Sequence, residues 1–322
     1  MSTTQVKAQF PAEQSADGQF VRQQDAFRRW VRADASSEFP AVAGRYHLYV
    51  SLACPWAHRT IVVRKLLGLE SAIGMTVVDP VRDDEHGWAF REVPGASSDP
   101  INGFQYLREA YLATDPQYRG RVTVPVLWDT QTRQIVSNSD DDIMRMLETE
   151  FTAITGSAST SRLDLFPETH REEIETLNEW IYETFNNGVY KAGFATSQQA
   201  YEQAAYAVFD TLDRLEQRLS SRRFLIDDHP VETDWRAFVT LVRFDAVYYG
   251  HFKCNLRRIV DYPNLWGYVR DLYQYDGVAE TVNIDHIKRH YYFTHDDINP
   301  TRIVPIGPDI DFTAPHGREA LK

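Results

Sequence analysis

A cysteine stands where the sequence changes from a strand pattern to a helix pattern. The β-rich run YHLYV (46–50) precedes Cys54-Pro55, and apolar residues then recur at helical spacing from 55 to 68. A thiol at the start of a helix meets unbonded backbone N–H groups and the positive end of the helix dipole, and both stabilise its thiolate. Proline suits the first helical turn because it has no N–H to leave unbonded. The sequence therefore predicts that Cys54 is a reactive nucleophile.

The position three residues after Cys54 holds Ala57, where dithiol redox motifs carry a second cysteine. Cys54 therefore cannot close a disulfide within its own motif. A covalent intermediate would be a mixed disulfide with an external thiol, resolved by a second external thiol. We expect the other cysteine, Cys254, to be structural. The alternative for Cys54 is a buried and inert thiol, since free cysteines are often buried.

A proline inside the β-rich run TVPVLWD (123–129) favours the reactive interpretation. Proline normally weakens a strand, because it cannot donate to the ladder. A cis proline beside the cysteine would leave the backbone of Val124 free to pair with a peptide-like thiol ligand. The alternative is a trans Pro125 on an edge strand. The order Cys54-Pro55 and then Val124-Pro125 favours thiol transfer.

The elements expected around these residues follow the thioredoxin order. Strands are predicted at 46–50, 75–79, 123–129 and 133–137, with helices over 55–68 and from about 138, where Asn138 or Ser139 is the expected N-cap. We expect an N-terminal extension at 1–40, a thioredoxin-like thiol-binding domain at 41–152 with a long insertion at 80–122, and an all-helical domain at 168–322 after a linker.

Composition excludes several function classes. The chain has 322 residues and a formal net charge of −12, with two cysteines and no basic cluster suited to a nucleic acid. No apolar run is long enough to span a bilayer, and the polar N-terminus has no signal-peptide core. We expect a cytoplasmic protein without nucleic-acid or membrane partners.

Five stretches together resemble the glutathionyl-hydroquinone reductases, the Xi class of glutathione transferases. They are CPWAHR (54–59), GWAF (87–90), RVTVPVLWD (121–129), NEWIYETFNNGVYKAGFA (178–195) and HIKRHYYFTHDDINPTRIVPIGP (286–308). The resemblance implies a thioredoxin-like N-terminal domain, a helical C-terminal domain of the glutathione-transferase type for substrate binding and dimerisation, and a homodimer. It also implies removal of glutathione, the co-substrate, from S-conjugated hydroquinones through a mixed disulfide.

The resemblance assigns the thiol site residue by residue. Cys54 matches the nucleophile, Trp88 would pack on the thiol ligand, and Arg121 would pair with a glycyl carboxylate. Val124, before the cis-type Pro125, would give backbone hydrogen bonds to the cysteinyl part. Without the resemblance, Trp88 is equally well a core residue of the insertion and Arg121 a solvated surface arginine.

Two tyrosines match those that contact the hydroquinone oxygens in this family. They are Tyr190 and Tyr291, whose phenols can donate hydrogen bonds to an oxygen that gains charge as the C–S bond breaks. They are two of 17 tyrosines, and most tyrosines simply pack with a wet hydroxyl.

One stretch departs from the family pattern, in which Glu and Ser hold the γ-glutamyl end of glutathione. The sequence reads Asn138-Ser139-Asp140, with serine at the glutamate position and aspartate at the serine position. A carboxylate at Asp140 is compatible with the ammonium group of glutathione. A thiol that lacks this ammonium, such as mycothiol, would need hydroxyl contacts at Ser139 instead. Both thiols remain open.

Rival interpretations concern metals and function. His286 and His290 have the spacing of metal ligands on a helix, but no third ligand is evident, so we expect a surface helix and no metal. A general thiol transferase or dehydroascorbate reductase of the Omega type also uses a single Cys-Pro cysteine. A non-enzymatic interaction protein with this fold is the remaining alternative.

Overall fold

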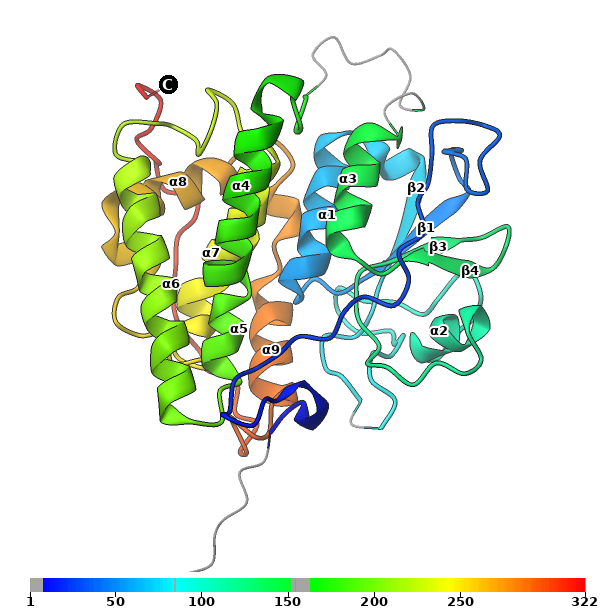
Figure 1. Cartoon of the computed structure of the whole chain (residues 1–322), viewed down its shortest axis with the longest axis horizontal. Coiled ribbons are helices and arrows are strands. Elements are labelled where there is room, and N and C mark those ends of the chain that lie inside the picture. The colour runs from blue at the N-terminus through cyan, green and yellow to red at the C-terminus, as the bar shows by residue number, and fades with distance from the viewer. Residues whose placement is uncertain (1–7, 84, 152–153, 155–162, 322) are drawn as a thin grey trace, which may run out of the picture. The chain divides into compact units, whose positions relative to one another are not determined.

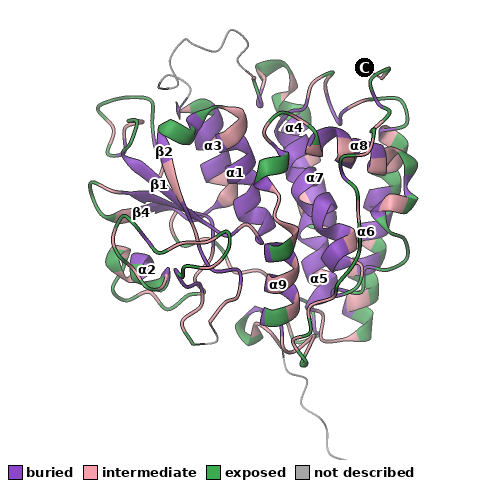
Figure 2. Cartoon of the chain, turned by 180° about the vertical axis from the view of Figure 1, so that it is seen from behind, coloured by how far each residue is buried: buried purple, intermediate pink, exposed green. Residues whose placement is uncertain are grey.

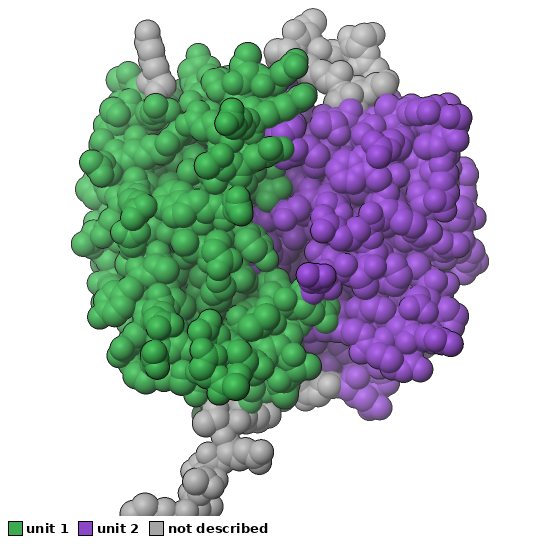
Figure 3. All heavy atoms as spheres, viewed as in Figure 1, with its two compact units in different colours: residues 1–23, 167–275, 291–322 green, residues 24–166, 276–290 purple. Residues whose placement is uncertain are grey.

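The structure is a computed structural model that describes residues 8–83, 85–151, 154 and 163–321. The chain forms two compact units (Figure 3). Residues 24–166 and 276–290 make up one, here called the sheet unit, and residues 1–23, 167–275 and 291–322 make up the other, here called the helical unit. Most of the predicted linker at 155–167 lies outside the described residues.

A four-stranded mixed sheet is the centre of the sheet unit. Its strands lie in the order β2 (Ile73–Val77), β1 (Tyr46–Val50), β3 (Val126–Asp129), β4 (Gln134–Ser137). β1 pairs parallel with β2 and antiparallel with β3, and β3 and β4 form an antiparallel hairpin. α1 (Pro55–Leu66) packs beside α3 (Asp140–Thr149), and α2 (Arg108–Thr114) contacts β4 (Figure 1). This arrangement confirms the predicted thioredoxin-like fold.

Burial explains why β1 and α1 form the core of this unit. All five residues of β1 are buried, and so are ten of the twelve residues of α1, as the colouring by burial in Figure 2 shows. α3 starts as its sequence predicts, because the Ser139 side chain accepts a hydrogen bond from the Asp142 backbone N–H. The three aspartates of its first turn lie where the helix dipole favours negative charge.

The insertion is held by the first part of α9 (Ile284–Thr294). His286 Nε2 lies 2.6 Å from the Pro94 carbonyl oxygen, and His290 Nδ1 lies 2.9 Å from the Pro80 carbonyl oxygen. Both histidines are buried, so the expectation of a surface helix is wrong. His286 and His290 are four residues apart, a spacing that metal-binding histidines on a helix also have. In this protein the spacing places both imidazoles on one helix face, where they bind backbone carbonyls of the insertion.

The helical unit confirms the predicted all-helical domain. Its helices are α4 (Arg171–Ile181), α5 (Gly188–Gly193), α6 (Gln198–Arg218), α7 (Glu232–Arg243), α8 (Pro263–Tyr273) and the last residues of α9. Two π-helical turns interrupt the α pattern, at Tyr182–Asn186 before α5 and at Phe244–Tyr248 after α7. Short 3-10 turns occur in both units. Those of the helical unit are Pro11–Glu13, Glu168–His170 and Ile259–Asp261, and those of the sheet unit are Leu69–Ser71 and Ala279–Thr281.

The N-terminal segment packs on the helical unit as far as residue 23. The rings of Phe10 and Phe20 each lie 5.3 Å from the ring of Phe194. Gly18 has a φ of +87°, and a Cβ there would come within 2.9 Å of the Ser197 backbone nitrogen, so this contact requires glycine. The tail from 295 to 321 contains no helix or strand, as its prolines predict.

A helix must be long and apolar to cross a bilayer, and the helices can be compared with this requirement. Among those that the structure describes, none combines the length and the apolar composition needed to cross a bilayer.

A buried ion pair joins the start of β1 to the end of β3. Arg45 Nε and Nη2 donate to the two carboxylate oxygens of Asp129 at 2.9 and 2.6 Å, and the Asp129 side chain is fully buried. Burial alone would raise the pKa of Asp129, but the hydrogen bonds from Arg45, Thr132 and a backbone N–H outweigh it and lower this pKa. The pair therefore fixes the two strands that lead to Cys54 and away from Pro125.

We expect Arg45→Met to lower the free energy of unfolding by about 3–5 kcal/mol at pH 7, because it leaves the Asp129 carboxylate buried without its charge partner. At pH values above the ordinary carboxyl pKa, the lowered pKa of Asp129 adds to the free energy of unfolding. This contribution is lost as the pH falls toward the lowered pKa. The difference between variant and wild type should therefore shrink in acid.

Urea unfolding of both proteins at pH 7 and at pH 3, below the ordinary carboxyl pKa, measures this difference. Arg214→Met is the matched control, because the Arg214–Asp210 pair is exposed and contributes only about 0–1 kcal/mol. Equal losses in the two variants would contradict the interpretation.

Candidate active site

Cys54 occupies the N-cap position of α1. Its backbone carbonyl accepts the first helical hydrogen bond, from the His58 N–H at 3.0 Å, and Pro55 is the first residue of the helix. The Sγ atom lies 3.6 Å from the Val124 carbonyl oxygen, and the residue is 9% exposed. The Val124–Pro125 peptide bond is cis, as the sequence predicts. The structure thus brings Cys54, Val124 and Pro125 together.

The second cysteine lies in a different environment. Cys254 is in the helical unit and fully buried, and burial raises the pKa of its thiol to about 12. A thiol with this pKa stays protonated at neutral pH and is a poor nucleophile. This environment agrees with the expectation that Cys254 is structural.

Two tyrosines of the insertion hold the chain before the cis peptide bond. The Tyr111 hydroxyl donates to the Thr123 carbonyl oxygen at 2.9 Å and accepts from the Thr123 N–H at 3.1 Å. The Tyr118 hydroxyl donates to the Arg121 carbonyl oxygen at 2.8 Å, and Arg121 is half-buried. No local pattern pointed to these tyrosines, because α2 lies inside a long segment without a clear period.

Trp88 is buried within the sheet unit rather than standing alone in the insertion. Its ring stacks on the ring of His290 at a centroid distance of 5.0 Å and an interplanar angle of 20°. The Arg82 guanidinium lies 5.7 Å from the same ring, and the Trp88 carbonyl accepts from the Leu107 N–H at 2.9 Å. Ring contacts and a backbone hydrogen bond therefore both hold Trp88 in place. No sequence pattern pointed to His290 as its partner.

Ser139 and Asp140 have protein partners at the start of α3. Ser139 caps the helix, and the Asp140 Oδ2 atom accepts from Arg59 Nη1 at 2.7 Å. The same Arg59 nitrogen lies 3.1 Å from Asp141 Oδ1, and the Arg59 side chain is only 1% exposed. One buried cation from α1 thus faces two carboxylates of α3. Arg59 belongs to the CPWAHR motif, but the sequence did not show that it binds these aspartates.

Tyr190 and Tyr291 meet through their hydroxyl groups in the helical unit. The two oxygens are 2.5 Å apart, and the Tyr291 oxygen lies 3.0 Å from that of Tyr248, a third tyrosine that sequence reasoning missed. Tyr190 is 8% exposed, Tyr291 is 1% exposed and Tyr248 is fully buried. Burial raises the pKa of Tyr291 well above its usual value, so this residue keeps its proton at neutral pH.

An arginine of the N-terminal segment covers the outer tyrosine. The Arg22 guanidinium lies 4.8 Å from the centroid of the Tyr190 ring, and its Nε donates to Asn187 Oδ1 at 2.9 Å. Cation–π contact of this kind favours a fixed ring orientation. Arg22 lies in the segment expected as an extension, so composition alone did not point to it.

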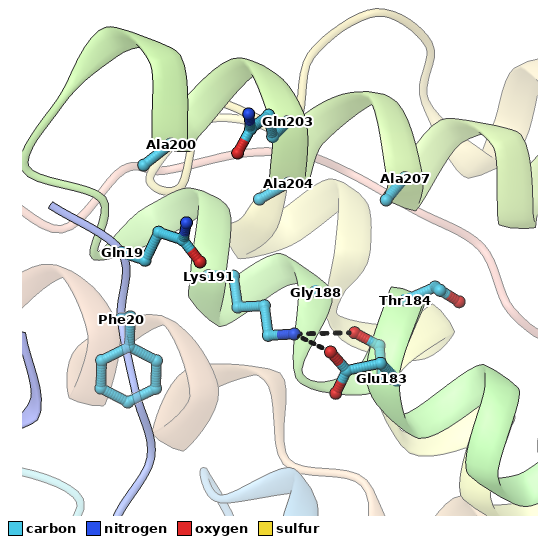
Figure 4. Close-up of a pocket in the computed structure, with 10 residues that line it drawn as sticks. All are labelled: Gln19, Phe20, Glu183, Thr184, Gly188, Lys191, Ala200, Gln203, Ala204 and Ala207. Atoms are coloured by element: carbon cyan, nitrogen blue, oxygen red, sulfur yellow. Dashed lines mark hydrogen bonds and ion pairs between the residues drawn. The ribbon is translucent and has the colours of Figure 1, made fainter. Parts of the chain in front are cut away.

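A separate cavity of about 190 Å³ lies beside α5 and α6 (Figure 4). Gly188, Ala200, Ala204 and Ala207 form part of its lining, and the ion pair of Lys191 with Glu183 lies at its side. None of the residues that the sequence predicts for the site lines this cavity.

The predicted residues thus fall into two groups. The residues predicted for thiol binding and Cys54 lie in the sheet unit, and Tyr190 and Tyr291 lie in the helical unit. Among the described residues, the cluster with the geometry of metal ligands is Asp227, Asp228 and His229, and it includes no predicted site residue.

Two family models and several known proteins match this chain. The model of the glutathione S-transferase N-terminal domain matches residues 53–150, and that of the C-terminal domain matches residues 198–271. Glutathionyl-hydroquinone reductase YqjG of Escherichia coli is 51% identical, with 95% of this chain and 94% of YqjG covered. Glutathionyl-hydroquinone reductase PcpF of Sphingobium chlorophenolicum is 47% identical, with 91% of each chain covered.

Solved structures extend the similarity to three dimensions. The glutathione-bound structure of E. coli YqjG has a TM-score of 0.86 at 50% identity, covering 91% of this chain and 96% of that one. The glutathione transferase Xi of Phanerochaete chrysosporium has a TM-score of 0.88 at 49% identity, covering 92% of this chain and 99% of that one. The chain therefore belongs to the glutathionyl-hydroquinone reductases, the Xi class of the glutathione S-transferase enzymes.

Proposed function

We propose that the protein reductively removes glutathione from S-conjugated hydroquinones, with Cys54 as the nucleophile. The observation that carries the proposal is the position of Cys54, which is the N-cap residue of the 12-residue helix α1 and lies beside the cis Val124–Pro125 peptide bond. The first N–H groups of such a helix have no helical partner and favour a thiolate. The names of the relatives YqjG and PcpF support the same reaction.

The first step forms a mixed disulfide. In the keto tautomer of the conjugate, the glutathionyl sulfur is bonded to a tetrahedral ring carbon next to a carbonyl group. The Cys54 thiolate attacks this sulfur, so that an S–S bond forms and the C–S bond breaks. The electron pair of the broken bond passes to the carbonyl oxygen and restores the aromatic ring. The hydroquinone leaves as a phenolate that takes up one proton.

The second step regenerates the enzyme. The thiolate of a second glutathione attacks the Cys54–glutathione disulfide, which releases glutathione disulfide and the Cys54 thiolate. The ring carbon gains two electrons, of which its own glutathionyl sulfur supplies one and the sulfur of the second glutathione supplies the other. Position 57 holds alanine and not a second cysteine, which suits this order of steps, because a resolving thiol in the motif would compete with the second glutathione.

The remaining predicted residues have roles in this proposal. Trp88, Arg121 and the Val124 backbone bind the thiol part of the conjugate. Tyr190 and Tyr291 stabilise the oxygen that becomes negative as the C–S bond breaks, and a buried phenol that keeps its proton suits this task. The pair is brought together by a hydroxyl contact of 2.5 Å, which favours action as a unit.

Glutathione is the thiol that we propose as co-substrate. A solved relative at 50% identity binds it, according to its title. Asp140 and Asp141 place two carboxylates beside the Arg59 guanidinium, and carboxylates at this position suit the ammonium group of a γ-glutamyl thiol. Mycothiol, which lacks this group, is the rival.

Incubation of the protein with each thiol disulfide, followed by intact mass measurement, tests both the nucleophile and the thiol. We expect a single adduct with the mass of glutathione, located on Cys54, and no adduct on Cys254. Cys54→Ser should form none and lose at least a thousandfold of conjugate turnover, because its hydroxyl cannot ionise at neutral pH. An adduct from mycothiol alone would overturn the choice of glutathione, and full activity in Cys54→Ser would overturn the mechanism.

Replacement of Tyr190 with Phe separates the proposed reaction from an Omega-type thiol transferase. We expect Tyr190→Phe to lower kcat for a glutathionyl hydroquinone by about ten- to a hundredfold, as for the loss of an oxyanion donor. The rate of reduction of a small glutathionyl disulfide should stay the same, because a thiolate leaving group needs no phenol. Tyr273→Phe, in α8, is the control. Equal losses with both substrates would contradict the proposed role.

A further inference from the structure

The third tyrosine of the hydroxyl chain has no role in the proposed reaction so far. Tyr248 Oη lies 3.0 Å from Tyr291 Oη, which lies 2.5 Å from Tyr190 Oη. The hydroxyls thus form a row in which Tyr291 is the central member. Each phenol has one proton and can also accept hydrogen bonds. Tyr291 can therefore donate to at most one of these two neighbours.

Two orders of donation run along the row in a single direction. In one, Tyr248 donates to Tyr291 and Tyr291 donates to Tyr190. In the other, Tyr190 donates inward and the row runs toward Tyr248. Only the first order lets Tyr190 direct its own proton at a substrate oxygen. Tyr190 is also the most exposed of the three at 8%, while Tyr291 is 1% exposed and Tyr248 is fully buried.

We propose that Tyr248 is a positioning residue for the reductive step, because its hydroxyl donates to Tyr291 and thereby sets the order in which Tyr190 donates to the quinol oxygen. The inference rests on the proposed function, since it assigns Tyr190 to this oxygen. Tyr291 then stabilises the oxygen through the hydrogen bond that it donates to Tyr190, and Tyr248 acts through Tyr291. A row of hydroxyls that donate in one direction polarises its last member and strengthens the hydrogen bond it gives.

Two members of the tyrosine row, Tyr190 and Tyr248, lie at π-helical turns, which supports this role. Tyr248 closes the π-helical turn Phe244–Tyr248, and the Tyr249 N–H donates to the Phe244 carbonyl five residues back at 2.8 Å. Tyr190 follows the other π-helical turn, in which the Asn187 N–H donates to the Tyr182 carbonyl at 2.8 Å. Such turns shift the helix face by one residue and occur frequently at functional sites.

Packing around Tyr248 restricts its ring to one orientation. The ring stacks on Phe252 at a centroid distance of 5.5 Å and an interplanar angle of 18°, and it meets the Phe244 ring edge-on at 6.3 Å. Burial keeps the Tyr291 proton in place, although the charge of Arg243 opposes it. Tyr248→Phe retains these ring contacts and removes only the hydroxyl.

Kinetics of Tyr248→Phe on a glutathionyl hydroquinone test the inference. We expect kcat to fall about three- to tenfold, the effect of one neutral hydrogen bond, with KM within twofold of wild type. Reduction of a small glutathionyl disulfide should be unchanged. Tyr262→Phe is the matched control, because its buried hydroxyl bonds Asp213 at 3.0 Å outside the row, and it should leave both reactions unchanged.

A double-variant comparison separates positioning from a structural effect. If Tyr248 acts through Tyr190, Tyr190→Phe and the double variant Tyr190→Phe/Tyr248→Phe should have the same kcat. An additive loss in the double variant, or an equal loss with both substrates, would overturn the inference. Tyr291→Phe provides a second test should Tyr248→Phe not fold. It should lower kcat at least as much as Tyr248→Phe, and the double variant Tyr190→Phe/Tyr291→Phe should have the same kcat as Tyr190→Phe alone.

The outcomes distinguish this inference from the proposed function. Wild-type kcat in Tyr248→Phe, with a deficient Tyr190→Phe, would overturn the role of Tyr248 and leave the proposed function intact. A wild-type protein that reduces the disulfide but not the conjugate would overturn the proposed function and the inference with it.

Discussion

The position of Cys54 at the N-cap of α1 is the constraint on which the rest of the site depends. The N-terminal end of a helix keeps its positive electrostatic character only while the helix is in place, and α1 is held because ten of its twelve residues are buried. The Arg45–Asp129 pair fixes β1 and β3, the strands next to Cys54 and Pro125. Fold and thiol chemistry are thus properties of the same packed elements.

The reaction that we propose divides between two sets of residues. Cys54, Trp88, Arg121 and Val124 lie in the sheet unit, whereas the tyrosine hydroxyls lie in the helical unit. A thiolate attack needs no proton donor, but a departing hydroquinone does. This division explains why single replacements in the tyrosine row are expected to affect one substrate class and to spare the other.

Sequence reasoning predicted the strands, α1, α3 and the longer helices, because strand and helix periods are strong where one face is buried. It also predicted the cis proline and the closeness of Cys54 to Val124, since both depend on a known order of elements. It missed α2 and α5, which have seven and six residues and too few turns to show a period. The partners Arg59, Tyr248 and His290 are set by tertiary packing and leave no local pattern. The spacing of His286 and His290 was misleading because helix geometry places such pairs on one face whatever they bind.

The reactivity of the two cysteines in the intact protein tests the central claim most directly. The rate of alkylation by iodoacetamide would be followed at each cysteine from pH 5 to pH 9 by mass spectrometry of the two peptides. An activated thiolate predicts that Cys54 reacts faster than a free cysteine at neutral pH and keeps its rate below pH 7, while Cys254 stays unlabelled. Alkylation of Cys54 no faster than that of an unstructured cysteine peptide, with the same fall in rate below pH 8, would contradict the account.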